Sequence, residues 1–288
     1  MTKFRYLLLV ALPFFLSACI ESQNVNTFAS SVTVVTDATS KIIDSDRATC
    51  SNINATISEI ETLPKIGKIG SANCADLGKM LDAIAGVNKV LGNYGKALGD
   101  ISQDTFINYD SDINSLQTIF KSLPAAHQPT QDQITAVSGL AGWVASLVTQ
   151  EEREKAIKDA MVGNNGEMKT NFHNVVTLLK QLVTQYSDGL DTTARITNTS
   201  LSLVSHEYGS TEPVAVAELS IRLSGNTRIS NDQKAVINQY VTALDAMSKA
   251  FDAATENPTA KELLPEVRDF SKKAWNVYQS FSKAFPNG

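Results

Sequence analysis

A run of apolar residues at helical spacing, between residues 75 and 101, constrains the fold of this chain more than any other feature. Apolar side chains recur there every three or four positions, which places them in one stripe along a helix. The stripe consists of Leu77, Met80, Leu81, Ile84, Val87, Leu91, Tyr94, Leu98 and Ile101. The pattern predicts a long amphipathic helix that buries one side.

Most of the remaining chain repeats the helical pattern between segments rich in proline and glycine, of which 64–73 is a predicted loop. Thr130 and Ser230 are each followed by glutamine three residues later, as in a capping box, and Asn257-Pro258 is typical of a helix start. A valine-rich stretch at 32–36 also allows a short strand. We expect helices over 31–46, 51–63, 75–101, 105–122, 131–158, 167–206 and 213–224, and two more beginning after Ser230 and at Pro258.

Glycines interrupt the predicted helix 75–101, among them Gly86, Gly92, Gly95 and Gly99. Each costs up to about 1 kcal/mol relative to alanine in a helix interior. Because small residues let a neighbouring helix approach closely, we interpret them as a tight helix crossing. The alternative is the floor of a groove for a ligand or peptide.

The first 18 residues have the layout of a secretory leader and not that of a transmembrane helix. Lys3 and Arg5 form a positive start, an apolar run follows, and small residues precede a cysteine. The segment Leu16-Ser17-Ala18-Cys19 resembles the lipobox of bacterial lipoproteins. The resemblance covers only about the first 20 residues.

This resemblance implies cleavage before Cys19, which would be diacylated and become the mature N-terminus. Residues 1–18 would then be a signal peptide, and the polar residues 19–30 an acylated tether. An ordinary cleavage that leaves a free N-terminal cysteine is the alternative. Because Ile20, and not an aspartate, follows the cysteine, the resemblance favours the periplasmic face of the outer membrane over the inner membrane.

With Cys19 acylated, Cys50 and Cys74 remain as a pair in an oxidising compartment, which predicts a disulfide. The bridge would close a loop of about 25 residues and stabilise the fold by roughly 3 kcal/mol. The pair lacks both the CxxC spacing and the nearby histidine of a redox or metal site. We expect this disulfide at the membrane-proximal end of the fold.

The charge of the mature chain bears on its partners. Without the two basic leader residues, 23 Lys and Arg residues face 30 Asp and Glu residues, a formal charge of −7. Such a chain lacks the basic surface of a nucleic-acid-binding protein. Anionic head groups would also repel it, so we expect contact with the membrane through the lipid alone.

Motifs that carry chemistry are missing from the sequence. It contains no HExxH, GxSxG, GxxxxGK[ST] or GxGxxG pattern. The aspartates at 104–112 lack the glycine and distal glutamate of a calcium loop, and we read them as the start of a helix. We therefore predict no catalytic, cofactor-binding or metal-binding residue; the histidines are scattered at His127, His173 and His206.

The predicted C-terminal helix has more aromatic residues than one buried stripe can hold. Leu263, Val267 and Phe270 define a stripe, and the remaining aromatic residues cannot all share it: Trp275, Tyr278 and Phe285. Such a helix is either buried on two sides or exposes a patch for a partner. These three residues are our candidate partner patch.

These observations predict an all-α fold, an elongated bundle of about eight or nine antiparallel helices with one disulfide. The bundle domain would span 31–288, and two subdomains joined near 163–166 are the alternative. For function we expect a lipid-anchored envelope protein that is not an enzyme and binds a partner protein through helical surfaces, in an accessory or immunity role. The alternative is a carrier of lipids or small ligands, with an apolar cavity beside the helix 75–101; an envelope enzyme ranks below both.

Overall fold

The computed structural model describes residues 7–102, 113–146, 166–209, 211–257, 260 and 262–284. These residues form seven α-helices and one short 3-10 helix, without a β-strand among them. The prediction of an all-α helical bundle with one disulfide is confirmed. Within the described residues, no helix is both long enough and apolar enough to cross a membrane.

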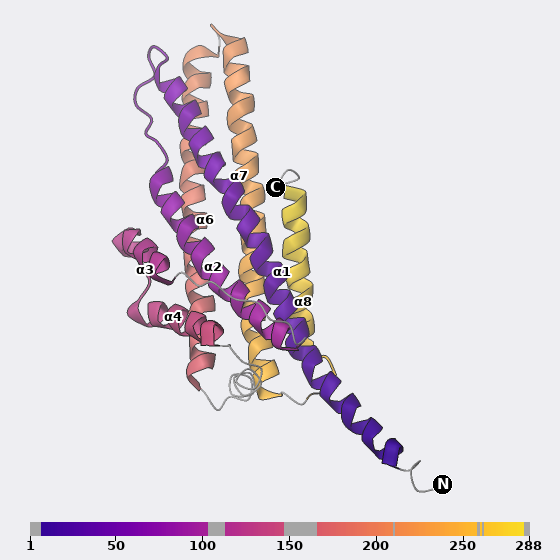
Figure 1. Cartoon of the computed structure of the whole chain (residues 1–288). Coiled ribbons are helices and arrows are strands. Elements are labelled where there is room, and N and C mark those ends of the chain that lie inside the picture. Colours follow the sequence, from indigo (N-terminus) through magenta and orange to yellow (C-terminus); the bar gives the residue numbers. More distant parts are fainter. Residues whose placement is uncertain are drawn as a thin grey trace.

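Five helices run along the long axis of the bundle (Figure 1). Helices α1 (Leu7–Glu61), α6 (Gly166–Tyr208) and α8 (Pro265–Ala284) run in one direction, and α2 (Cys74–Ser102) and α7 (Pro213–Glu256) run in the other. The shorter elements α3 (Ile113–Ser122), η1 (Ala125–His127) and α4 (Gln131–Ser146) lie at the side of the bundle. We call the end with the α7–α8 connection the base, and the end with residues 62–73, 211 and 212 the tip.

An aromatic cluster forms the centre of the main core, toward the base. The rings of Phe172 and Phe251 stack with centroids 4.1 Å apart, and Phe28 contacts both of them and Phe270. Tyr94 also packs against Phe172, with ring centroids 5.5 Å apart. The core therefore joins elements from both sides of residues 163–166 and does not divide there into two subdomains.

A smaller apolar cluster lies at the tip, formed by Ile60, Ile66, Val204, Val216 and Leu219. Between the two clusters, α6 buries hydroxyl residues where its apolar pattern is weak. Thr193, Thr197 and Ser200 each donate a hydrogen bond to the carbonyl four residues earlier. These bonds satisfy the hydroxyl groups within the helix, so a polar stretch can be buried.

Two of the long helices are longer than the sequence patterns predicted. The segments expected as helices 31–46 and 51–63 both belong to α1, and the strand alternative at 32–36 is wrong. The segments 213–224 and 231 onward both belong to α7, so the predicted start after Ser230 is wrong. Local start signals were overridden there because each helix packs against its neighbours on both sides of the predicted break.

The segment expected to be a tether is packed into the base from residue 24. Asn24 donates hydrogen bonds to the Glu262 and Ala260 carbonyls (3.1 and 3.4 Å) and accepts one from the Leu264 amide (2.9 Å). Phe28 is fully buried. The boundary at residue 30 is therefore wrong, because apolar and amide side chains in 24–30 have partners in the bundle.

Helix starts near the C-terminus differ from the prediction as well. The last helix begins at Pro265, not at Pro258, and Asn257 caps the end of α7 through its backbone N–H to the Ala253 carbonyl.

The capping box before α4 is confirmed: the Gln133 amide donates to Thr130 Oγ1 (3.3 Å), and the Thr130 amide donates to Gln133 Oε1 (2.9 Å). The predicted loop 64–73 is also confirmed.

The glycines of α2 form a tight helix crossing with α1. A Cβ atom built on Gly95 would lie 2.7 Å from Val32 Cγ1, and one on Gly92 would lie 2.9 Å from Thr36 Oγ1. Gly86 is covered in the same way by Leu116 of α3. The packing interpretation is confirmed, and the groove-floor alternative is wrong, because side chains already fill the space above these glycines.

The Cys50–Cys74 disulfide joins α1 to the start of α2. Asn54 supports it by two hydrogen bonds with the backbone of Ala72, both 2.9 Å. Since α1 rises about 1.5 Å per residue, Cys50 lies about 39 Å from Asn24 along the helix, toward the tip. The disulfide therefore lies toward the tip and away from the base, and its expected place at the membrane-proximal end stays a prediction.

Candidate interaction surface on helix α8

Helix α8 has one buried face and one exposed face. Its buried positions follow helical spacing and pack against α7 and α1: Val267, Phe270, Ala274, Val277 and Phe281. These five residues supply the apolar surface by which α8 packs on the bundle. The aromatic residues outside it are therefore not needed for docking.

Trp275 and Tyr278 lie together on the exposed side of α8. Their side chains are 52% and 36% exposed, and their rings stack with centroids 5.3 Å apart. The spacing of three residues places them on adjacent turns of one face. Two of the three residues of the predicted patch thus form one exposed aromatic surface, and Phe285 lies outside the described residues.

Basic residues accompany this aromatic pair. Arg268 and Lys272 are exposed and precede Trp275 by seven and three residues, which places all three on one side of the helix. The sequence of α8 contains four basic and two acidic residues, whereas the whole chain carries a formal charge of −5. We call Arg268, Lys272, Trp275 and Tyr278 the α8 face.

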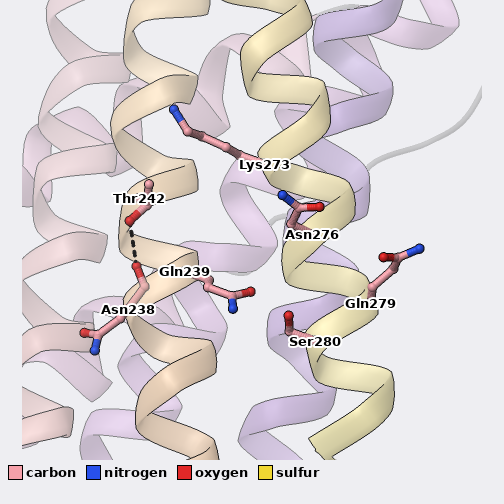
Figure 2. A pocket seen from close by; sticks show the side chains of 7 residues that line it. All are labelled: Asn238, Gln239, Thr242, Lys273, Asn276, Gln279 and Ser280. Carbon is pink, nitrogen blue, oxygen red and sulfur yellow. Dashed lines mark hydrogen bonds between the residues drawn. The ribbon is translucent and has the colours of Figure 1, made fainter.

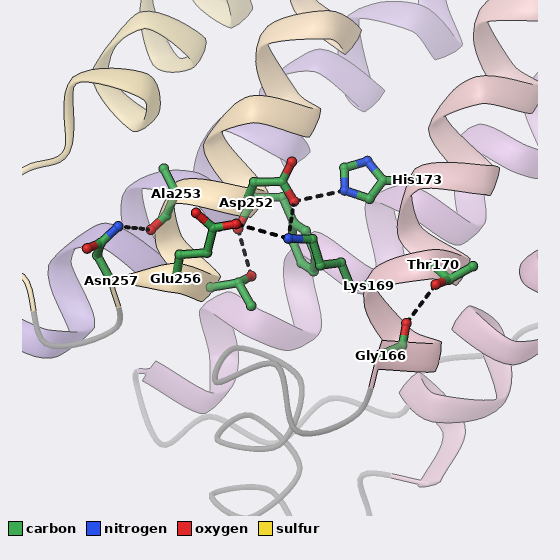
Figure 3. Close-up of polar contacts among 10 residues, drawn as sticks. Gly166, Lys169, Thr170, His173, Asp252, Ala253, Glu256 and Asn257 are labelled. Atoms are coloured by element: carbon green, nitrogen blue, oxygen red, sulfur yellow. Dashed lines mark hydrogen bonds and ion pairs between the residues drawn. The ribbon is translucent and has the colours of Figure 1, made fainter.

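A cluster of four ionisable side chains lies at the base between α6 and α7 (Figure 3). Lys169 Nζ lies 2.9 Å from Asp252 Oδ1 and 3.2 Å from Glu256 Oε1. His173 Nε2 donates to the same Asp252 oxygen at 2.9 Å, and its ring packs edge-on against Phe172 and Phe251. Within the described residues, His173 has no nucleophilic side chain as a hydrogen-bond partner.

The electrostatics of this cluster follow from its place at two helix ends. Lys169 is in the first turn of α6, and Glu256 is the last residue of α7. Each charge therefore has the same sign as the partial charge of the helix end on which it lies, and the helix dipole disfavours it there. Partial burial disfavours the charge on Asp252, but the hydrogen bonds from Lys169 and His173 outweigh it and lower the pKa of this carboxyl. The bond to Asp252 likewise raises the pKa of Lys169. The arrangement is a cross-helix ionic cluster that holds two helix ends together.

Sequence reasoning missed this cluster because His173 and Asp252 are 79 residues apart. The signal that the sequence offered was a lysine, Lys169, near a helix start and a glutamate, Glu256, at a helix end, where the helix dipole disfavours each charge. It also missed Asn24, for which no local pattern exists. Both depend on which helix ends meet at the base.

The other predicted residues lie apart from the α8 face. Cys19 is within α1, where the backbone is described and the side chain is not. His127 is in η1, and His206 lies near the tip beside Glu207, far along α6 from His173. In the part of the chain that the structure describes, no group of three or more His, Cys, Asp or Glu residues could hold a metal ion.

No protein family model, curated protein or solved structure matches this chain. Function must therefore be inferred from its own residues. The leader, the α8 face and the packing at the base are the features that bear on it.

Proposed function

We propose that this chain is a lipoprotein of the cell envelope, anchored through Cys19, that acts by binding a partner protein through the α8 face and not by catalysis. The observation that carries the proposal is the stacked, exposed pair of Trp275 and Tyr278. Tryptophan, tyrosine and arginine are the residues most enriched at the energetic centres of protein interfaces. They add contact area at a small cost in side-chain entropy.

The charge of the α8 face indicates the chemistry of the partner. Arg268 and Lys272 flank the aromatic pair on the same side of the helix. A complementary surface would be apolar at its centre and would carry carboxylates beside it. We therefore propose an acidic protein surface as the partner.

The position of the α8 face relative to the proposed lipid also limits the partner. Only four residues separate Cys19 from Asn24, and even an extended chain of that length spans at most about 18 Å. Trp275 lies about 16 Å along α8 from Leu264, which is bonded to Asn24. The α8 face would thus lie within about 35 Å of the acyl chains. We propose a partner at or near the membrane, with the periplasmic face of the outer membrane as the location.

The proposal is tested by crosslinking in living cells that express the full chain from its own leader. A photo-crosslinking amino acid replaces Trp275 in one strain and Val214 in another. Val214 is a matched control because it is also apolar, is 81% exposed and lies at the tip. We expect a discrete protein adduct from position 275 and none from position 214.

Two further variants separate the parts of the proposal. We expect Trp275→Ala to weaken recovery of the partner at least tenfold and to leave membrane fractionation unchanged. We expect Cys19→Ala to move the protein out of the membrane fraction. Adducts at both positions, or at neither, would refute the α8 face as the interface. Unchanged fractionation of Cys19→Ala would refute the anchor.

A further inference from the structure

A polar groove lies between α7 and α8 (Figure 2). Its volume is about 470 Å³, in the range of ligand sites in proteins. From α8 it is lined by Lys273, Asn276 and Ser280, whose spacing of three and four residues places them on a flank of the helix away from Trp275 and Tyr278. A fourth lining residue of α8, Gln279, follows Trp275 by four positions, so the groove borders the α8 face.

Three of the described side chains that line the groove are amides without a hydrogen-bond partner in the described part of the protein. Gln239 of α7 and Asn276 and Gln279 of α8 make no side-chain hydrogen bond within the described residues. Each amide offers two donors and one carbonyl acceptor. Thr242 donates its hydroxyl proton to the Asn238 carbonyl at 2.9 Å, which leaves its oxygen as an acceptor. Figure 2 shows the Gln239 side chain extending from α7 toward α8, whereas the Gln279 side chain extends from α8 away from α7.

The groove is also close to electrically neutral. None of the described residues that line it is acidic or apolar. The one cation among these described lining residues, Lys273, is paired with Asp269 of the same helix, 2.6 Å away. An anion would have to compete with that carboxylate, and an apolar ligand would leave the amides without partners. The walls therefore suit an uncharged ligand that carries many hydroxyl or acetamido groups.

We propose that this groove binds an uncharged oligosaccharide. Planar amides on two facing helices can bond to hydroxyl groups on both edges of a sugar chain. The groove is open, so the chain can continue beyond it. Because the described residues that line the groove include no aromatic ring, binding depends on hydrogen bonds that replace bound water. We therefore expect weak affinity, with a Kd of about 0.1 to 1 mM. The inference does not depend on the partner of the α8 face.

The test is a titration of the full chain, purified in mild detergent, with two probes: a tetramer of N-acetylglucosamine and maltotetraose. Calorimetry or ligand-observed NMR gives the Kd. We expect saturable binding of at least one probe, weakened fivefold or more by Gln239→Leu and by Asn276→Leu. Both positions are exposed, so neither change should alter the melting curve. The matched control is Gln117→Leu, an exposed amide on α3, which should leave the Kd unchanged.

Two further measurements distinguish a sugar in this groove from a sugar on the α8 face and from a peptide in the groove. Trp275→Ala should leave sugar binding unchanged, and its loss in that variant would place the sugar on the α8 face and overturn the proposal. A blocked alanine–glycine peptide should not compete with the sugar. Binding of that peptide in preference to both sugars, or no saturable sugar binding, would also overturn it.

Discussion

At the scale of single residues, a few buried polar side chains set the register of the long helices. Asn88 is 1% exposed; it donates to the Thr36 carbonyl at 2.7 Å and accepts from the Tyr240 hydroxyl at 3.1 Å. These bonds connect α1, α2 and α7. Because any sliding of one helix would leave buried polar groups without partners, this network favours a single register. Burial raises the pKa of Tyr240, so its hydroxyl remains a donor at ordinary pH.

The ionic cluster at the base leads to a prediction about pH. The pKa of Asp252 is lower in the folded state than its ordinary value of 3.8. Its contribution is therefore fully present above the unfolded pKa and is lost as pH falls through the folded pKa. We expect Asp252→Asn to lower the free energy of unfolding at pH 7 by about 1 kcal/mol, as for partly exposed ion pairs. The difference between wild type and variant should shrink as pH falls below 3.8 toward the folded pKa of Asp252.

Urea unfolding at pH 7, 5 and 3 measures this difference. Asp188→Asn is the matched control, because Asp188 is an exposed aspartate on α6 without a side-chain partner in the described residues. It should be close to neutral at all three values. A loss for Asp252→Asn that is constant across pH would show that the effect is not ionic.

At the scale of elements, the glycines of α2 differ sharply in how much space surrounds them, and the crossing of α1 and α2 depends on those without space for a side chain. A Cβ on Gly95 would lie 2.7 Å and 2.8 Å from Val32 Cγ1 and Cβ, and 3.2 Å from the Ala29 carbonyl oxygen. Val32 is β-branched and cannot rotate away within a helix. Gly78, on the same helix, has nothing within 4 Å of its Cβ position.

We therefore predict opposite effects for two identical substitutions on α2. Gly95→Ala should destabilise the fold by about 1 to 3 kcal/mol. The free-energy cost of moving the helices apart to fit the added methyl group exceeds the gain in helix propensity. Gly78→Ala should stabilise it by about 0.5 to 1 kcal/mol. Thermal unfolding of both variants measures this. Two changes of the same sign would contradict the α1–α2 crossing.

At the scale of the whole molecule, the base and the tip are held by different means. The base has the aromatic core, Asn24 and the ionic cluster, whereas the tip has a small apolar cluster and the nearby disulfide. The loop at the tip is tied back by Glu61, whose carboxylate accepts from the amides of Ile69 and Gly70. The disulfide itself belongs to the edge of the main core, because Cys50 is a member of that core and Cys74 packs against it.

Removal of the disulfide should accordingly lower the stability of the whole chain. A bridge over 24 residues of separation contributes about 3 kcal/mol through the unfolded state. We expect Cys50→Ser with Cys74→Ser to lower Tm by about 6 to 12 °C for a chain of this size. A reductant should have the same effect on the wild type and none on the double variant. An unchanged Tm in both would show that the tip unfolds independently of the base.

Several features of this protein could be predicted from its residues alone: the helical class, the amphipathic stripe of α2, its close contact through glycine, and the disulfide pair. These features depend on short-range periodicity or on counting cysteines. Trp275 and Tyr278 could also be selected in this way, because they could not share a stripe already filled by Val267 and Phe270. The cleavage and acylation of Cys19 stay predictions.

The packing of the helices was needed to establish where helices continue, where the chain is tied down and which distant groups meet. The start signal at Ser230 lies inside α7, and the bonds of Asn24 make part of the predicted tether belong to the base. Lys169 and Asp252 share a site because α6 begins where α7 ends, and the groove exists because α7 and α8 present amides to each other. Such features arise between residues on different helices, and local periodicity contains no information about which helix faces pack together.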